Sequence, residues 1–290
     1  MNYLGQHFLK NTDAIKKIIA TLDIESGDII IEIGPGKGAL TLPMAESFKN
    51  LNSNLKIIAI EKDEKLADEL NLKIKERGLE NLKIVKGDAL KELPEIIKKC
   101  KFPPKADQPM AEKIKNLKFK IVGNIPYYIT GKLLRTISEL ENKPQNCVLM
   151  VQKEVAERIS SAPPHNNLLA AATSVWADVK IILKLRAAEF DPPPEVDSAV
   201  IQLVPNKKIL SKKELADFYK LIHVIFKQPR KTLVNNIKDG LDLTREEIEK
   251  LFQPEADPPS AENSFNLEMN YRPQDLTIEN ILELVRRLKI

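Results

Sequence analysis

Cysteine is scarce in this chain of 290 residues, which contains only Cys100 and Cys147. Two thiols in a chain of this length match no metal-binding spacing and argue for a reducing compartment rather than a disulfide scaffold. No apolar run is long enough to span a membrane, and the N-terminus lacks a charged segment followed by an apolar one. We therefore expect a cytoplasmic protein with no metal site and no membrane partner.

The sequence also lacks an internal repeat and a strong net charge, because 45 Lys and Arg face 41 Asp and Glu. The distribution of charge is more informative. Residues 205–240 carry nine basic and three acidic residues, whereas residues 241–290 carry six basic and eleven acidic ones. A basic segment beside an acidic one suggests a surface for phosphates. A solvated, lysine-rich helix face would give the same pattern.

Strand-like and helix-like segments alternate over the first half of the chain. Strands are predicted at residues 29–33, 56–60, 82–86, 119–122 and 147–151. Helical segments are predicted at 39–48, 63–77 and 90–99. This alternation is typical of a parallel, doubly wound α/β sheet. Two later strands, 179–185 and 198–204, have no long helix between them, so we expect an antiparallel pair at the sheet edge.

From Ser211 onward the pattern becomes all-helical. Leu215, Phe218, Ile222 and Ile225 recur at helical spacing, and further helices are expected at 243–252 and 276–288. We place a domain boundary near Pro205, which gives a first domain at 1–205 and a smaller helical domain at 206–290.

A glycine-rich segment, Glu32-Ile33-Gly34-Pro35-Gly36-Lys37-Gly38, follows the first strand of the expected sheet. Glycine lets the backbone turn tightly and approach a ligand closely. The segment lacks the G-x-G-x-x-G spacing with which dinucleotide-binding proteins hold a pyrophosphate. S-adenosylmethionine has no phosphate, and it needs room for its amino-acid part and a nearby acid or backbone group for its ammonium.

Acidic residues end the next two strands. Glu61 can accept hydrogen bonds from both hydroxyls of a ribose, and Asp88 can accept the amino group of an adenine. Each residue has a plainer explanation, since Glu61 lies in an exposed charged run and Asp88 could cap the helix that begins at Ala89. Ligands bind at the carboxyl ends of such sheets, so the three consecutive strand ends together favour a cofactor site.

The fourth strand leads into Asn124-Ile125-Pro126-Tyr127. An Asn side-chain carbonyl and a backbone carbonyl can together accept both N–H groups of a planar amine. Proline fixes its own φ, and an aromatic ring can stack on a base. A simple proline turn after a strand would account for the same four residues.

With these motifs in place, the sequence resembles the small-subunit (16S) ribosomal RNA adenine N6,N6-dimethyltransferases over most of its length. Further segments that resemble this family are 5–9, 151–158, the proline-rich loop 190–199 and the basic motif 230–236. The resemblance implies a Rossmann-like class I methyltransferase sheet with a smaller all-helical C-terminal domain, and S-adenosyl-L-methionine as the cofactor. By the same resemblance, the cofactor-binding residues are His7, Leu9, Gly34, Gly36, Glu61, Asp88 and Asn124.

The resemblance also implies a reaction at two adjacent adenines in a hairpin near the 3′ end of 16S rRNA, in a small-subunit precursor. Asn124 and the carbonyl of Pro126 or Ile125 would hold the amine, Tyr127 would stack on the extruded base, and Phe190 could cover its other face. The alternative for Phe190 is an anchor packed under the prolines of its loop. We expect Tyr128 and His165 to be, respectively, a packing residue and a surface residue.

Contacts with RNA phosphates are expected from Lys227, Arg230 and Lys231, and the protein is expected to act as a monomer. The segment 91–118 is longer than the family usually has and is interpreted as a surface excursion, with an extra RNA contact as the alternative. The alternatives are a large-subunit rRNA adenine methyltransferase, a non-catalytic rRNA-binding assembly factor on the same fold, and a DNA adenine methyltransferase.

Overall fold

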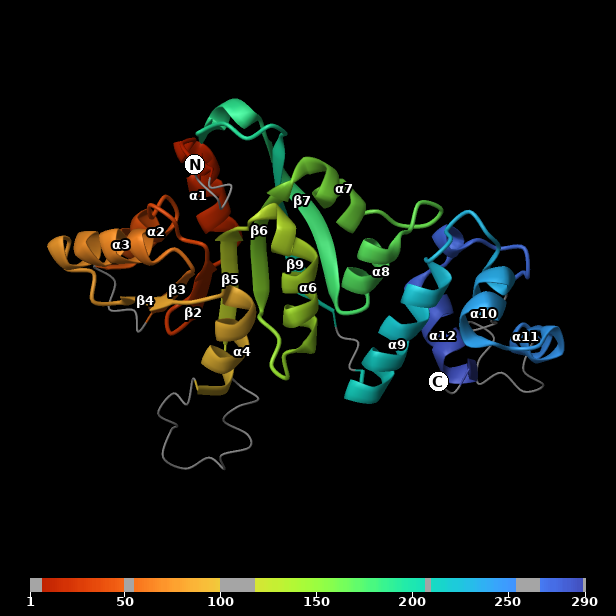
Figure 1. The fold of residues 1–290 in the computed structure, drawn as a ribbon. Helices are drawn as coiled ribbons and strands as arrows, with labels where there is room; N and C mark the ends of the chain where they lie inside the picture. The colour runs from red at the N-terminus through yellow and green to blue at the C-terminus, as the bar shows by residue number, and fades with distance from the viewer. Residues whose placement is uncertain (1–6, 50–54, 100–117, 207–209, 254–266, 289–290) are drawn as a thin grey trace, which may run out of the picture. The chain divides into compact units, whose positions relative to one another are not determined.

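The computed structural model describes residues 7–49, 55–99, 118–206, 210–253 and 267–288. The chain divides into two compact units (Figure 1), one of residues 1–157 and 177–205 and one of residues 158–176 and 206–290. The first unit is of the α/β class and the second is helical, as predicted. Residues 158–176, placed in the first domain by the sequence, group with the helical unit.

The first unit is built on a seven-stranded sheet with the order β4-β3-β2-β5-β6-β9-β7. Its strands are β2 (Ile29–Ile33), β3 (Lys56–Glu61), β4 (Leu82–Lys86), β5 (Phe119–Asn124), β6 (Asn146–Gln152), β7 (Ala177–Leu185) and β9 (Ser198–Pro205). The first five are parallel to one another, and β9 runs antiparallel to both β6 and β7. The predicted strands and the antiparallel pair at the edge are therefore confirmed.

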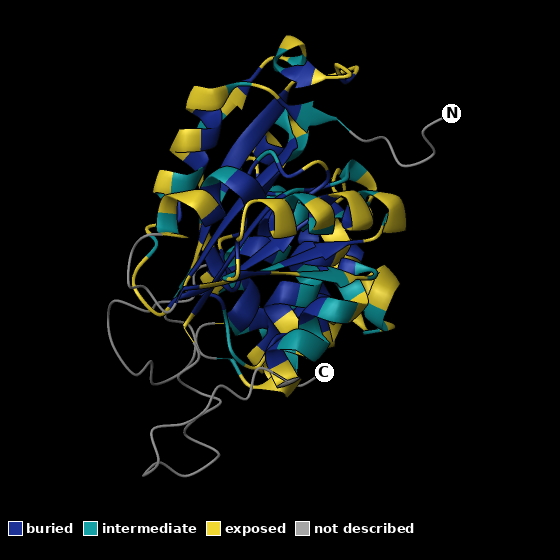
Figure 2. Cartoon of the chain, turned by 90° about the vertical axis from the view of Figure 1, so that its left-hand side faces the viewer, coloured by how far each residue is buried: buried dark blue, intermediate teal, exposed yellow. Residues whose placement is uncertain are grey.

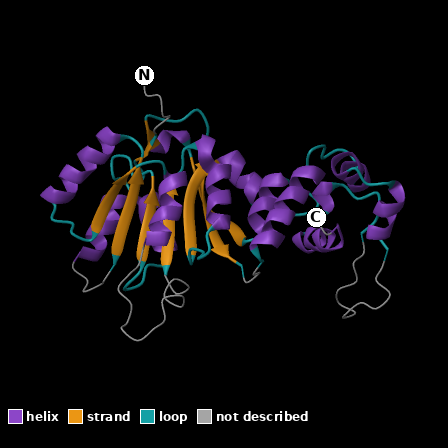
Figure 3. Cartoon of the chain, turned by 60° about the horizontal axis from the view of Figure 1, so that its bottom comes forward, coloured by secondary structure: helices purple, strands orange, loops and turns teal. Residues whose placement is uncertain are grey.

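Helices cover the sheet on both faces (Figure 3), which explains why β2 is buried along its whole length. The helices of this unit are α1 (Thr12–Thr21), α2 (Thr41–Lys49), α3 (Glu64–Glu76), α4 (Ala89–Lys99), α6 (Thr130–Glu139) and α7 (Lys153–Ile159). In α3, Asp63 caps the N-terminus and Ala67, Leu70 and Ile74 face the core. This is the amphipathic spacing expected of a helix on a sheet. Figure 2 shows the same division between buried strands and exposed outer helix faces.

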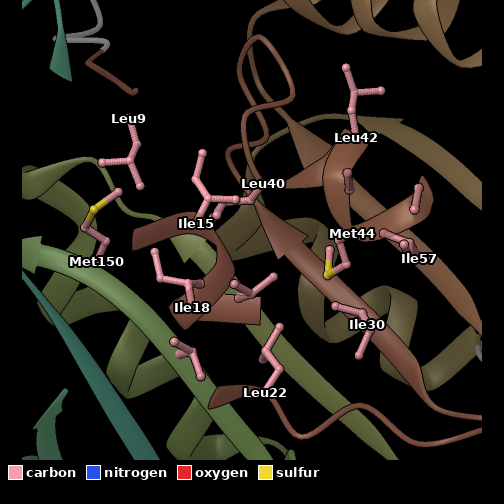
Figure 4. Close-up of a cluster of buried hydrophobic side chains, with 14 of the residues drawn as sticks. Leu9, Ile15, Ile18, Leu22, Ile30, Leu40, Leu42, Met44, Ile57 and Met150 are labelled. Carbon is pink, nitrogen blue, oxygen red and sulfur yellow. The ribbon is translucent and has the colours of Figure 1, made fainter. Parts of the chain in front are cut away.

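The core of this unit joins elements that are far apart in the sequence (Figure 4). Ile15 and Ile18 from α1 pack in one cluster with Ile30 from β2, Ile57 from β3 and Met150 from β6. The cluster also contains Leu9 and Phe190, which come from a separate two-stranded sheet of β1 (Phe8–Leu9) and β8 (Phe190–Asp191). The core therefore fixes the N-terminal segment and the proline-rich loop together.

A buried ion pair interrupts the apolar surroundings of β5. Lys120 is 5% exposed and its Nζ lies 2.7 Å from Oδ2 of Asp28, which is 1% exposed. The same Asp28 oxygen accepts the N–H of Glu25 at 2.7 Å, and Lys120 also donates to the carbonyl of Asp23. Both charges are therefore compensated where water cannot reach them.

The second unit contains α8 (Leu168–Ser174), α9 (Lys212–Ile225), α10 (Leu233–Leu241), α11 (Arg245–Leu251) and α12 (Ile278–Leu288). The expected core face of α9 is confirmed by the buried Phe218, Ile222 and Ile225. Thr244 caps α11. The helices α1, α6, α7, α8 and α10 were not predicted. No helix among the described residues is long and apolar enough to cross a membrane.

Two interpretations of the sequence fall partly on residues outside the described ranges. The expected surface excursion begins with α4, and its remainder at 100–117 is not described. The proline-rich stretch from Pro254 to Pro259, expected to separate the last two helices, also lies outside the described residues.

We predict that Lys120→Met lowers the free energy of unfolding by about 3–5 kcal/mol, because it leaves the Asp28 carboxylate buried without a cation. Urea unfolding of the variant and the parent measures this difference. The control is Lys118→Met, which removes the same charge from a side chain that is 64% exposed. A loss no larger than that of the control would show that the buried pair contributes little.

Candidate active site

The functional residues predicted for the first domain lie around one pocket. The strand order reverses between β2 and β5, and such a reversal leaves a crevice at the carboxyl ends of the strands. The pocket at this place is lined by His7, Leu9, Gly34, Gly36, Glu61, Asp88, Asn124, Pro126, Tyr127 and Phe190. Residues separated by more than 180 positions in the sequence are thus brought together by the fold.

The glycine-rich loop turns directly after β2. Gly34 and Gly36 have φ values of +69° and +54°, a region that residues with a Cβ enter at a cost. The Gly36 N–H donates to Oε2 of Glu61 at 2.9 Å. A Cβ on Gly36 would lie 2.7 Å from the ring of Phe8. The absence of a side chain therefore lets β1 lie directly against this loop.

Glu61 is buried at the end of β3, and its carboxylate is held in place. Besides the bond to Gly36, its Oε1 accepts the N–H of Asp63 at 2.9 Å. Each carboxylate oxygen has a further lone pair, so Glu61 can still accept hydrogen bonds from a ligand in the pocket. The exposed position considered for Glu61 in the sequence is not found.

Asp88 serves as a helix cap and also lines the pocket. Its Oδ1 accepts the N–H of Leu90 at 3.0 Å, and its Oδ2 lies 3.1 Å from the Nζ of Lys62. Partial burial acts to raise the pKa of Asp88, but these two partners and the nearby charge of Lys91 outweigh it and hold the pKa below its usual value. Asp88 is therefore ionised at neutral pH, and its contact with an adenine stays a prediction.

Glu32 is a buried acid next to the C-terminal end of the apolar strand β2, and it lines the pocket. Its Oε2 has no hydrogen-bond partner among the described residues. Burial raises the pKa of Glu32 to about 8. A buried carboxyl with one unpartnered oxygen in a pocket is costly to the fold alone, and it suits a cationic group of a ligand.

The N-terminal segment covers one side of the pocket. β1 pairs with β8, so that Leu9 lies opposite Phe190. His7 Nδ1 donates to the carbonyl of Pro192 at 2.8 Å. The Nζ of Lys37 lies 4.6 Å from the centre of the Phe8 ring, which is within cation–π range. These contacts attach the segment both to the glycine-rich loop and to the proline-rich loop.

Asn124 ends β5 with its side-chain amide in a defined orientation. Its Nδ2 donates to the backbone carbonyl of His7 at 2.7 Å. The Oδ1 atom accepts no hydrogen bond from the described residues. The N-terminal segment thus occupies the donor side of the amide and leaves the acceptor side available in the pocket.

The residues after Asn124 distinguish the two carbonyls considered as a second acceptor. The Pro126 carbonyl already accepts the N–H of Ile129 at 3.0 Å. The Ile125 carbonyl accepts no backbone hydrogen bond within the described parts of the chain. Tyr127 is half-buried, and its hydroxyl lies 3.3 Å from Oγ of Ser198, which fixes the ring at the pocket wall.

The exposure of two aromatic residues does not match the roles predicted for them. Phe190 lines the pocket but is only 1% exposed and belongs to the core cluster, so its stacking role stays a prediction beside the loop-anchor alternative. Tyr128 was expected to pack inside, which is wrong, since it is 62% exposed. The short 3₁₀ turn Tyr127–Ile129 directs consecutive side chains to different sides.

The three predicted RNA-binding residues lie in the helical unit. Lys227, Arg230 and Lys231 are exposed in the turn between α9 and α10.

Several residues that line the pocket were not selected from the sequence, among them Phe8, Glu32, Lys62, Tyr128 and Met150. Of these, only Glu32 could have been identified from the sequence, because an ionisable residue within a β-branched strand is unusual unless it has a function. His165 is exposed, as expected.

We predict that Gly36→Ala weakens the binding of S-adenosylmethionine roughly tenfold, because the left-handed backbone costs about 1–2 kcal/mol and the new Cβ displaces Phe8. Calorimetric titration measures the affinity. Gly131→Ala is the control, since nothing lies within 4 Å of the Cβ that it adds. Equal affinities for both variants would contradict the role assigned to the loop.

We predict that Glu32→Gln stabilises the cofactor-free protein, and by more at pH 8 than at pH 5. The unfolded carboxyl ionises near pH 4.5 whereas the folded one stays protonated up to about pH 8. Parent stability therefore falls between these values, by up to about tenfold in the unfolding constant per pH unit. Urea unfolding at the two pH values measures the effect, and Glu76→Gln at an exposed helix position is the control. A gain that does not grow with pH would contradict the assignment.

Comparison with known proteins identifies the family. The family model described as ribosomal RNA adenine dimethylase matches residues 2–255. The ribosomal RNA small subunit methyltransferase A of Dehalococcoides mccartyi (strain CBDB1) is 36% identical over 250 residues, which are 86% of this chain and 78% of the relative. The protein of the same name from Lactobacillus acidophilus is 34% identical over 98% of this chain and 90% of its own length.

Solved structures show the same architecture. A dimethyladenosine transferase from Plasmodium falciparum superimposes with a TM-score of 0.71 and 25% identity over 98% of both chains. The 23S rRNA methyltransferase ErmE shares the fold, with a TM-score of 0.66 and 21% identity over 98% of this chain and 100% of its own. Because the family model covers most of the chain, the protein belongs to the ribosomal RNA adenine dimethylase family.

Proposed function

We propose that this protein dimethylates the N6 amines of adenines in the small-subunit ribosomal RNA. As a member of its family, it is an S-adenosylmethionine-dependent rRNA adenine dimethyltransferase. The relatives reported above are named as small-subunit enzymes, which favours that subunit over the large one. The observation that carries the proposal is the orientation of Asn124, whose donor side is occupied by His7 and whose acceptor side remains available.

The pocket residues fit the cofactor. Glu61 presents a fixed carboxylate suited to two hydroxyls of a ribose, and the unpartnered Oε2 of Glu32 suits an ammonium group. The glycine-rich loop itself adds no side chain at Gly34 or Gly36, both of which line the pocket. S-adenosylmethionine supplies an electrophilic methyl group on a sulfonium.

The chain's own residues then have to hold the adenine amine. Asn124 Oδ1 and the Ile125 carbonyl accept its two N–H groups, and this draws the nitrogen lone pair out of conjugation with the ring. We favour Ile125 over Pro126 because the Pro126 carbonyl already accepts the Ile129 N–H. Orientation of this kind can contribute about 7–11 kcal/mol to lowering a barrier. No strong base is needed, because the amine becomes acidic once it is methylated and its proton can leave afterwards.

Tyr127 is the residue placed to stack on the base. A stacked aromatic contributes about 1–3 kcal/mol per base. An adenine inside a duplex cannot reach a pocket at the sheet edge, so the target is unpaired or extruded. We propose two adjacent adenines in a hairpin near the 3′ end of 16S rRNA, in a precursor particle. We further propose a monomer, because one chain supplies the whole pocket.

The decisive experiment is transfer of labelled methyl groups from S-adenosylmethionine to 30S particles from an unmethylated strain. Nucleoside analysis of the product should give dimethyladenosine, and mapping should place it in the small-subunit RNA. A non-catalytic assembly factor would bind the particles without transfer. Parallel reactions with 50S particles and with DNA test the alternative substrates, which labelling there in place of 30S particles would favour.

We predict that Asn124→Ala lowers methyl transfer by about 10²–10³-fold, the usual cost of removing one preorganised polar contact. Cofactor affinity should change much less, since Asn124 contributes one of many pocket contacts. Single-turnover transfer and calorimetric titration measure the two effects. Asn71→Ala, on α3, is the control for loss of an amide away from the pocket. Transfer at the parent rate by Asn124→Ala would remove the basis for the amine clamp.

A further inference from the structure

A single buried amide holds the turn that carries the exposed cations of the helical unit. We name residues 227–232, between α9 and α10, the basic turn. Asn236 lies one turn into α10 and is only 4% exposed. Its Oδ1 accepts the N–H of Gln228 at 3.2 Å, and its Nδ2 donates to the Gln228 carbonyl at 3.0 Å. The same Nδ2 lies 3.3 Å from the carbonyl of Lys231 and 3.1 Å from that of Thr232.

These bonds join the two ends of the basic turn. Gln228 lies at its beginning and Lys231 and Thr232 at its end, so one side chain closes the loop from within. Thr232 caps α10 by accepting the N–H of Asn235 at 3.4 Å, and the Lys231 N–H donates to the Gln228 carbonyl at 2.9 Å. The turn is therefore a fixed structure rather than a flexible connection.

The cations on this turn are exposed to solvent. The side chains of Lys227 and Arg230 have no acidic or hydrogen-bond partner among the described residues. Lys231 makes an ion pair with Asp239 at 3.0 Å, and both side chains are about half exposed. Such an exposed pair is weak, so a phosphate can replace Asp239 at little cost.

Only an amide satisfies the interior of the turn. It combines one acceptor for the Gln228 N–H with donors for several carbonyls. A carboxylate at this place would face three carbonyl oxygens, and an apolar side chain would leave the Gln228 N–H without the acceptor that it has now. A fixed turn presents its cations without the entropy loss that ordering a flexible loop would add on binding.

We propose that Asn236 is a positioning residue for RNA binding, and that it acts by holding Lys227, Arg230 and Lys231 in the arrangement that meets RNA phosphates. This inference rests on the proposed function, since it takes rRNA as the ligand. According to this proposal, the buried and uncharged side chain of Asn236 affects the electrostatic contribution to RNA affinity.

The test compares the binding of 30S particles from an unmethylated strain by the full-length parent and by Asn236→Ala, at several salt concentrations. We expect affinity to fall about tenfold and the slope of log affinity against log salt to fall by about 0.7–0.9 for each phosphate that the variant no longer neutralises. S-adenosylmethionine affinity, measured by calorimetry, should stay at the parent value. Asn280→Ala removes comparable side-chain bonds at the start of α12, and it should leave the slope unchanged.

A double-mutant comparison separates positioning from a general loss of stability. In the background of Lys227→Ala, Arg230→Ala and Lys231→Ala, the change Asn236→Ala should have no further effect on RNA affinity. The same loss in both backgrounds, with an unchanged salt slope, would overturn the proposal. RNA binding by the triple variant with the affinity of the parent would also overturn the proposal. That outcome would not affect methyl transfer by the parent, so the proposed function would stand.

Discussion

The reversal of strand order between β2 and β5 is the constraint on which the site depends. Strands to one side of this point connect in one direction and strands to the other side in the opposite direction, so the loops diverge and leave a crevice. The glycine-rich loop leaves β2 on one side of the crevice, and Asn124 ends β5 on the other. A methyl donor bound beside the glycine-rich loop and an amine held by Asn124 can therefore meet within this one crevice.

The buried acids show how function costs stability in this fold. Lys120 and Asp28 compensate each other at the opposite end of the sheet, so their burial serves the structure. Glu32 has no such partner for its Oε2, and its pKa rises to about 8 because it is buried. The hydrogen-bond and ion-pair partners alone thus distinguish a structural ion pair from an acid in a pocket that has an unpartnered oxygen. The second arrangement is the one expected of a binding site.

Each unit of the protein contains a neutral amide side chain that backbone groups hold in one orientation. Asn124 in the first unit and Asn236 in the second are each fixed by backbone groups and carry no charge. An amide offers a donor and an acceptor on one planar group, so one side can be held by the protein while the other serves the ligand or the rest of the turn. A carboxylate suits neither place, because the donor atom of each amide meets backbone carbonyl oxygen: that of His7 at Asn124, and those of Gln228, Lys231 and Thr232 at Asn236.

The sequence by itself determined the α/β class, most strand positions and the glycine and acid motifs, because these depend on local periodicity and on residues next to a strand end. It missed α1, α6, α7, α8 and α10 as separate helices, although the equally short α11 was predicted, because most of the stability of a helix in a protein comes from tertiary packing rather than from its local pattern. Tertiary structure alone decided that Tyr128 faces solvent, that Phe190 belongs to the core, and that His7 orients Asn124. Each of these depends on a contact between segments far apart in the chain, and no pattern within one segment encodes such a contact.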